Sequence, residues 1–134
     1  MAKYDEANPE MLEITGFSCY RVAIEEEWRM TNKSRESSIA TGKQYASRVR
    51  AEIDTEALVL LFGSCAKNSA NDRSDIDIAV ISKEFGDDIP NDFARLYVIA
   101  YNVNSEIEPH PFSCKRWKNP TPFIREIMET GVAL

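Results

Sequence analysis

Ala57-Leu58-Val59-Leu60-Leu61-Phe62-Gly63-Ser64 and, after ten further residues, Asp75-Ile76-Asp77-Ile78-Ala79-Val80-Ile81 decide the fold of this chain. Each stretch holds a short apolar run of the kind that forms a buried strand. Side chains alternate along a strand, so Asp75 and Asp77 share one face of the second strand, about 7 Å apart. The even-numbered apolar residues of that strand share the other face, which we expect to pack on the core.

The two halves of this pattern are suited to different parts of one ligand. Paired carboxylates on a rigid strand bind hard divalent cations such as Mg²⁺, which often share their oxygen ligands with phosphates. Gly63 allows the backbone to approach a ligand closely. Ser64 lies where we expect a helix to begin, with free N–H groups and a positive dipole end that favour a phosphate. The combination predicts nucleotide chemistry, and no other phosphate-binding fingerprint occurs in the chain.

Each half taken alone has an ordinary structural explanation. An isolated Asp-x-Asp is common on surface strands, and Gly-Ser is an ordinary turn. Their spacing, with each at the correct end of an apolar run, favours a joint function.

At residues 61–67 and 73–80, Leu-Phe-Gly-Ser-Cys-Ala-Lys and Arg-Ser-Asp-Ile-Asp-Ile-Ala-Val, the chain resembles the polymerase-β-type nucleotidyltransferases, in particular their minimal single-domain branch. The resemblance extends over about residues 38–134, although Asn68 stands where the family usually has a glycine. It implies that Gly63 and Ser64 hold the phosphates of ATP. It also implies that Asp75 and Asp77 hold two Mg²⁺ ions together with a third carboxylate on a later strand.

Ser105-Glu106-Ile107-Glu108-Pro109 predicts that later strand and offers two acids on the same face. We favour Glu108 as the third carboxylate because it lies deeper in the strand, and we keep Glu106 as the alternative. Both could instead be exposed charges on an edge strand, where they deter aggregation. The resemblance assigns Lys67 to the triphosphate; Arg73 could assist it or be a surface residue.

Two other reactive residues lie near the motif. His110 is the only histidine. It lies two residues beyond Glu108 and could approach the site, but its position between two prolines predicts a structural or exposed loop residue, so we leave it out of the catalytic set. Cys65 has no base partner in the sequence and is interpreted as a small packing residue.

The remaining pattern predicts one α/β (α+β) domain, with a polymerase-β-like small mixed sheet flanked by helices. We expect an N-terminal extension of uncertain structure at residues 1–37 and the nucleotidyltransferase domain at 38–134. Apolar spacing predicts helices from Ser38 to Ile53, from Phe93 to Val103 and from Thr121-Pro122 to Gly131. The predicted core-facing residues of the last two helices are Phe93, Leu96, Tyr97, Ala100 and Val103, and Phe123, Ile124, Ile127 and Met128. The residues after Glu108 suffice for a helix and a terminal strand.

Charge and cysteine content limit the function classes. The net charge of −6 argues against general nucleic-acid binding. Residues 31–53 are basic, with five bases and two acids, which fits a solvated helix face or a surface for a partner or triphosphate. Three widely spaced cysteines and no apolar run long enough to span a membrane predict a reducing cytoplasm.

The resemblance also implies a role. Minimal nucleotidyltransferases of this type pair with small helical HEPN-type proteins, transferring AMP from ATP to a tyrosine of the toxin and so acting as its antitoxin. We expect that role here, with the acceptor on another molecule. The alternatives are a catalytically silent module that neutralises its partner by contact, and a homodimer that adenylates a small molecule.

Overall fold

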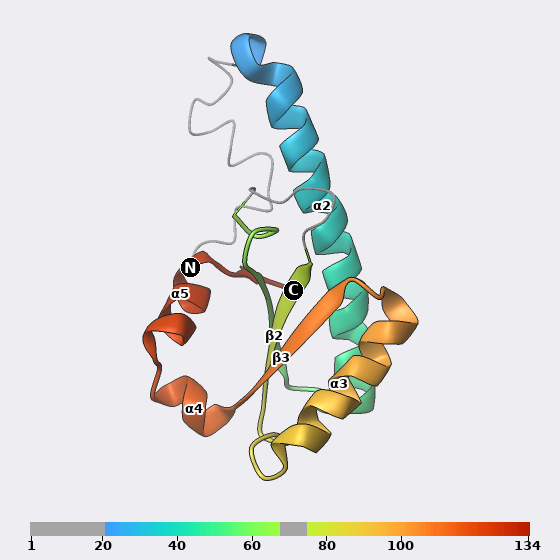
Figure 1. Ribbon diagram of the computed structural model, residues 1–134, viewed down its shortest axis with the longest axis vertical. Helices are drawn as coiled ribbons and strands as arrows, with labels where there is room; N and C mark the ends of the chain where they lie inside the picture. Colours follow the sequence, from blue (N-terminus) through green and yellow to red (C-terminus); the bar gives the residue numbers. More distant parts are fainter. Residues whose placement is uncertain (1–20, 68–74) are drawn as a thin grey trace.

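A computed structural model describes residues 21–67 and 75–134, with side chains from residue 35 onward in the first range. The elements run along the chain in the order α2 (Arg21–Glu52), β1 (Leu58–Phe62), β2 (Ile76–Ser82), α3 (Ile89–Val103), β3 (Ile107–Ser113), α4 (Cys114–Lys118), α5 (Pro122–Thr130) and β4 (Val132–Ala133). In Figure 1 the sheet separates α2 and α3 from α4 and α5.

The four strands form one mixed sheet in the order β3-β2-β1-β4. β1 pairs antiparallel with β2 and β4, whereas β2 and β3 are parallel. The register places Phe62 opposite Asp77, and Asp77 opposite Glu108. This mixed sheet with flanking helices confirms the predicted fold class.

The larger core lies between α2, α3 and one face of the sheet. The even-numbered residues of β2 point into it, as predicted, and are at most 6% exposed. Tyr45 of α2 is fully buried and its hydroxyl donates to the Leu96 carbonyl of α3, 2.9 Å away, which joins the two helices. Burial raises the pKa of Tyr45 far above its usual value, with the nearby Tyr97 adding to the effect.

The opposite face of the sheet is only partly covered. A second core cluster joins this face to α5 and the start of α4 through Phe62, Ala79, Ile81, Phe112, Ile124 and Ile127. Along β2 the same face changes from Asp77 to Ala79 and Ile81, so its polar part lies at the beginning of the strand. This distribution leaves one end of the face open for a site.

The helix predicted from Ser38 starts earlier, because α2 already begins at Arg21. The helix predicted from Phe93 also starts earlier. Asp88 caps α3 by accepting from the Asn91 N–H, and Pro90 occupies its first turn. Proline is tolerated there because the first helical N–H groups have no partner within the helix. What the sequence suggested to be a turn is therefore the start of a helix.

The apolar faces predicted for α3 and α5 need correction. Phe93 and Tyr97 of α3 are 38% and 45% exposed, whereas Ile99, which was not predicted, is buried. On α5, Ile124 and Ile127 are buried as predicted but Phe123 is 49% exposed. Hydrophobic side chains therefore remain at the surface on both helices.

The last helix has the ends that the sequence predicted. Thr121 caps α5, its hydroxyl accepting from the Ile124 N–H, and Pro122 occupies the first turn. Gly131 ends the helix, and β4 follows as the terminal strand. The short helix α4 was not predicted.

The third strand was predicted at the wrong position. β3 begins at Ile107 and continues through Pro109 and Pro111 to Ser113. It is an edge strand whose Glu106 carbonyl accepts from the Ile76 N–H, so the odd-numbered residues direct their backbone groups away from β2. Pro109 and Pro111 have no N–H group, and because their backbone faces away from β2 the sheet loses no hydrogen bond between β3 and β2.

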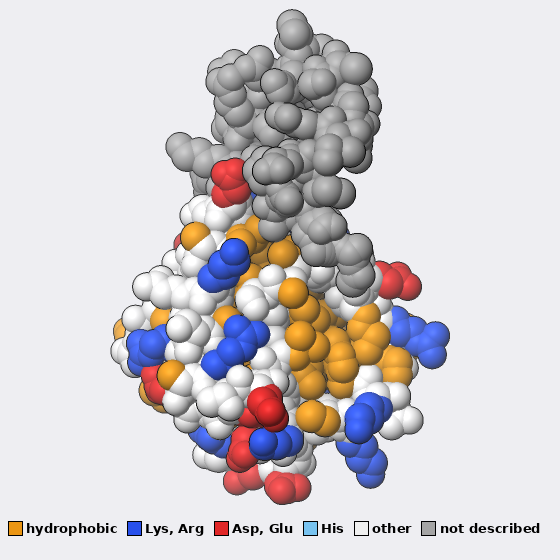
Figure 2. All heavy atoms as spheres, turned by 180° about the vertical axis from the view of Figure 1, so that it is seen from behind, with side chains coloured by type: hydrophobic (Ala, Val, Ile, Leu, Met, Phe, Trp, Pro, Cys, Tyr) orange, Lys and Arg blue, Asp and Glu red, His pale blue; other side chains and the backbone are white. Residues whose placement is uncertain are grey.

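The surface is mixed in character. On the face shown in Figure 2, hydrophobic side chains gather in one patch with basic side chains near its border. In the part of the chain that the structure describes, no helix is both long and apolar enough to cross a membrane.

Candidate metal and phosphate site

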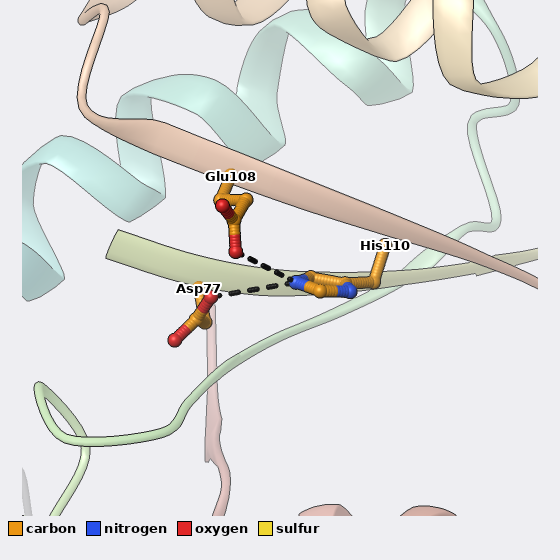
Figure 3. Close-up of side chains that lie close together, drawn as sticks. All are labelled: Asp77, Glu108 and His110. Atoms are coloured by element: carbon orange, nitrogen blue, oxygen red, sulfur yellow. Dashed lines mark hydrogen bonds and ion pairs between the residues drawn. The ribbon is translucent and has the colours of Figure 1, made fainter. Parts of the chain in front are cut away.

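Three ionisable side chains meet at the open end of the sheet (Figure 3). Asp77 comes from β2, and Glu108 and His110 come from β3. The His110 Nε2 atom lies 3.4 Å from Asp77 Oδ1 and 3.6 Å from Glu108 Oε1. Each residue offers one ligand atom such that all three atoms lie within 4.8 Å of one another.

The parallel register explains this convergence. Asp77 is opposite Glu108, and His110 is two residues further along β3, opposite Ala79. All three side chains therefore project from the same face of the sheet. The small Ala79 beside His110 leaves room for the ring to turn back toward the carboxylates.

Aromatic side chains pack around His110. The Phe62 ring meets the imidazole edge to face, with 5.0 Å between ring centroids, and contacts Phe123 in the same manner at 5.8 Å. Such contacts restrict the orientation of the imidazole. The polar group is thus supported by an apolar wall from β1 and α5.

Gly63 joins the predicted phosphate loop to this cluster. Its φ of +77° is a left-handed conformation that glycine adopts readily. A Cβ atom at this position would lie 2.5 Å from Asp77 Oδ2. The loop backbone therefore lies directly against the carboxylate, so a phosphate on the loop and a cation on Asp77 would be neighbours.

The neighbouring acids and His110 shift the pKa of Glu108 in opposite directions. The pKa of Glu108 is raised, first because its protonated carboxyl donates a hydrogen bond to Asp77, then by partial burial and by the negative charges of Asp77 and Asp75. The neighbouring His110 acts in the opposite direction. The pKa of Tyr97 on α3 is also raised, first by desolvation and then by Glu108, Asp75 and Asp77.

These residues fit a divalent cation. Two carboxylates and an imidazole are common metal ligands, and their atoms already converge on one point. A cation would also neutralise the negative charges of Asp77 and Asp75, which raise the pKa of Glu108 further after its hydrogen bond to Asp77 and its partial burial. Asp77 and Glu108 would hold the metal, which supplies charge neutralisation for phosphate oxygens when bound.

The other predicted metal and acid residues lie around this cluster. Asp75 is exposed and immediately precedes β2; it does not join the three converging groups, but its charge reaches Glu108. Glu106 is exposed ahead of β3 and is likewise outside them. Of the two alternatives for the third carboxylate, the structure brings Glu108 to Asp77.

The predicted phosphate-binding residues are described in part. Residues 63–67 form a turn in which the Lys67 N–H donates to the Gly63 carbonyl at 3.2 Å, and the half-buried Ser64 lies within it. Whether a helix continues beyond this turn lies outside the described residues, as does Arg73. The Lys67 side chain forms an exposed ion pair with Glu126 of α5.

Cys65 is a packing residue, as predicted. It is 3% exposed within the main core cluster. Its thiol donates to the Asp75 carbonyl at 3.4 Å. This contact ties the turn at residues 63–67 to the residue that precedes β2.

His110 is the residue that the sequence interpretation placed wrongly. The flanking prolines suggested a loop, yet His110 lies within β3 and its side chain is 28% exposed against the two acids. The signal was its spacing of two from Glu108, which gives the same strand face once the strand is extended through the prolines.

Comparison with known families agrees with this geometry. The sequence model of the family described as "Polymerase beta, Nucleotidyltransferase" matches residues 43–134, more than half of the chain. The protein therefore belongs to the polymerase-β nucleotidyltransferase family and contains a minimal nucleotidyltransferase domain of that type. No curated protein and no solved structure matches it.

Proposed function

We propose that this nucleotidyltransferase transfers AMP from ATP to a hydroxyl of a partner protein, with Mg²⁺ as the expected cofactor, and that it acts as the antitoxin of a HEPN-type toxin in the cytoplasm. The observation that carries the transferase activity is the contact of the Gly63 backbone with Asp77, which in turn lies opposite Glu108. Phosphate-binding and metal-binding groups are thereby placed side by side. Free Cys65 and Cys114 support a reducing compartment.

The chemistry assigned to the chain's residues is limited. The acceptor oxygen forms a bond to the α-phosphorus, the bond from that phosphorus to the bridging oxygen breaks, and pyrophosphate leaves. Gly63 and Ser64 hold the phosphates, and Lys67 offers a positive charge to them. A carboxylate of the cluster takes the proton of the acceptor hydroxyl.

An exposed apolar face on α3 supports a protein acceptor. Ile89, Phe93, Tyr97 and Tyr101 follow one another at steps of four along the helix and are 38–79% exposed. Phe93 lines the same cavity as His110, and its ring stacks on that of Tyr97. Contiguous apolar surface beside a site is typical of a binding face.

The test is intact mass spectrometry of the chain and of the proteins that co-purify with it from its native host, after incubation with ATP and Mg²⁺. We expect the partner to gain one or more AMP units. Asp77→Asn is the inactive control, and Glu84→Gln, an exposed acid beyond the far end of β2, is the matched control that should retain activity.

Two other outcomes would replace the proposal. A stable complex without added mass, with both the unmodified chain and Asp77→Asn, would indicate a silent binding module. Consumption of ATP by the isolated chain with a small-molecule acceptor would indicate a homo-oligomeric adenylyltransferase instead.

A further inference from the structure

We infer that His110 is a metal ligand, and that Asp77, Glu108 and His110 form a mixed nitrogen–oxygen site that selects a first-row transition ion over Mg²⁺. The inference rests on the metal site of the proposed function and changes the ion expected there from Mg²⁺ to a transition ion, but it concerns binding and does not require that AMP be transferred. It rests on the convergence shown in Figure 3.

The distances suit a shared ion. Two ligand atoms that are each about 2.1 Å from one ion lie roughly 3.4 Å apart at a tetrahedral angle and roughly 3.0 Å apart at a right angle. The observed separations from His110 Nε2 are 3.4 Å to Asp77 and 3.6 Å to Glu108. The cluster thus needs little rearrangement to enclose an ion, and its spacing is nearer the tetrahedral value.

The donor set determines which ion is preferred. Mg²⁺ favours oxygen ligands in near-ideal octahedral geometry and loses its waters reluctantly. Imidazole suits first-row transition ions such as Co²⁺ and Zn²⁺ better than Mg²⁺, and the affinity for these ions is generally higher than for Mn²⁺, which serves here as the spectroscopic probe. Adding the His110 imidazole to the carboxylates of Asp77 and Glu108 therefore moves the preference away from Mg²⁺.

The surroundings hold the imidazole in the orientation that such a ligand needs. The ring is packed edge to face on Phe62. Within β3, His110 lies between Pro109 and Pro111. Proline fixes the backbone φ on either side of His110. The Nε2 atom faces both carboxylates at once, which places the nitrogen where a ligand to a shared ion would be.

The competing explanation is an imidazolium ion that merely pairs with the two acids. Pulsed electron paramagnetic resonance separates the two, because Mn²⁺ bound directly to imidazole shows coupling to the ¹⁴N nucleus. His110 is the only histidine in the chain, so a protein without a histidine tag has a single imidazole that could give this signal.

We expect the full chain to bind Mn²⁺ with ¹⁴N coupling that disappears in His110→Gln. The Mn²⁺ dissociation constant should rise at least about tenfold in that variant, whereas the Mg²⁺ constant should change by less than about threefold. His110→Asp restores an all-carboxylate site and should favour Mg²⁺ relative to the unmodified chain. Glu84→Gln is the matched control and should behave as the unmodified protein.

Mn²⁺ binding without ¹⁴N coupling would overturn the inference and assign the ion to the carboxylates alone. Absence of Mn²⁺ binding at millimolar concentration would overturn it as well. Thermal unfolding of each variant without metal shows whether the fold is retained. If the unmodified chain shows ¹⁴N coupling but transfers no AMP to any partner, the proposed function is refuted and the metal site stands.

Discussion

Replacing Gly63 by alanine tests the geometry that joins the phosphate loop to the metal site. The new Cβ atom would lie 2.5 Å from Asp77 Oδ2, so the carboxylate must retreat by about 0.9 Å to reach an ordinary contact distance of roughly 3.4 Å. The φ of +77° destabilises the folded state by about 1–2 kcal/mol when the residue is not glycine. Stability and metal binding should therefore both fall.

The expected decrease in melting temperature is about 3–10 °C, since 1 kcal/mol corresponds to roughly 3–5 °C for a chain of this size. A displacement of about 1 Å at a catalytic group can reduce the rate on the order of 100-fold. The assays are thermal unfolding by circular dichroism and Mn²⁺ titration by calorimetry, for which we expect at least about a tenfold weaker affinity.

Gly86→Ala is the matched control. Gly86 also has positive φ, +121°, but its Cβ would meet Ser113 at 3.0 Å rather than a cluster residue. This variant should lose stability and keep its Mn²⁺ affinity within about twofold. Equal metal affinities for Gly63→Ala and the unmodified protein would refute the placement of the loop against Asp77.

Three further predictions concern the core and the loop. Ser82→Ala removes a 2.6 Å hydrogen bond to buried Asp54 and should cost about 1.5–3 kcal/mol at pH 7 by urea unfolding. The hydrogen bond from Ser82 is the main cause of the lowered pKa of Asp54. The difference in free energy of unfolding between the unmodified protein and Ser82→Ala should therefore be full above the unfolded pKa of about 3.9. It should shrink as pH falls through the lower pKa of folded Asp54. Tyr45→Phe loses its bond to Leu96 and should cost about 1 kcal/mol in the same assay. Lys67→Met should weaken ATP binding about tenfold by calorimetry while Mn²⁺ affinity stays unchanged; unchanged ATP affinity would remove Lys67 from the phosphate site.

The sequence predicted those parts of the fold that local pattern determines. Short apolar runs specified β1 and β2, and Thr121-Pro122 with Gly131 specified the ends of α5. The exposure of Phe93 and Tyr97 was not predicted, because helical spacing identifies an apolar stripe but does not show whether another element covers it. Only the tertiary arrangement shows that Ile99 is buried in their place.

The family resemblance predicted that Glu108 joins Asp77 across two strands, and the structure brings them together, but the local sequence pattern predicted only which side chains share a face within each strand. Spacing identified the acids on one face, whereas the partner of Asp77 depends on the register of β2 with β3, which no local pattern specifies. His110 was missed for a related reason: the prolines beside it suggested that the strand had ended. Their compatibility with an edge strand follows from the order of the strands.

The register also explains why this end of the sheet is a site and not merely a surface. Like charges directly opposite each other destabilise a pair of strands, yet Asp77 lies opposite Glu108 and the pKa of Glu108 is raised as a result. A one-residue slip would turn every side chain of β3 to the other face and bury Glu108, the one acid of this strand, so the apolar residues of β3 hold Glu108 beside Asp77. The sequence thus keeps two acids opposite each other on neighbouring strands, and packing elsewhere in the fold offsets the cost. Such an arrangement is expected where charge is needed to bind a ligand.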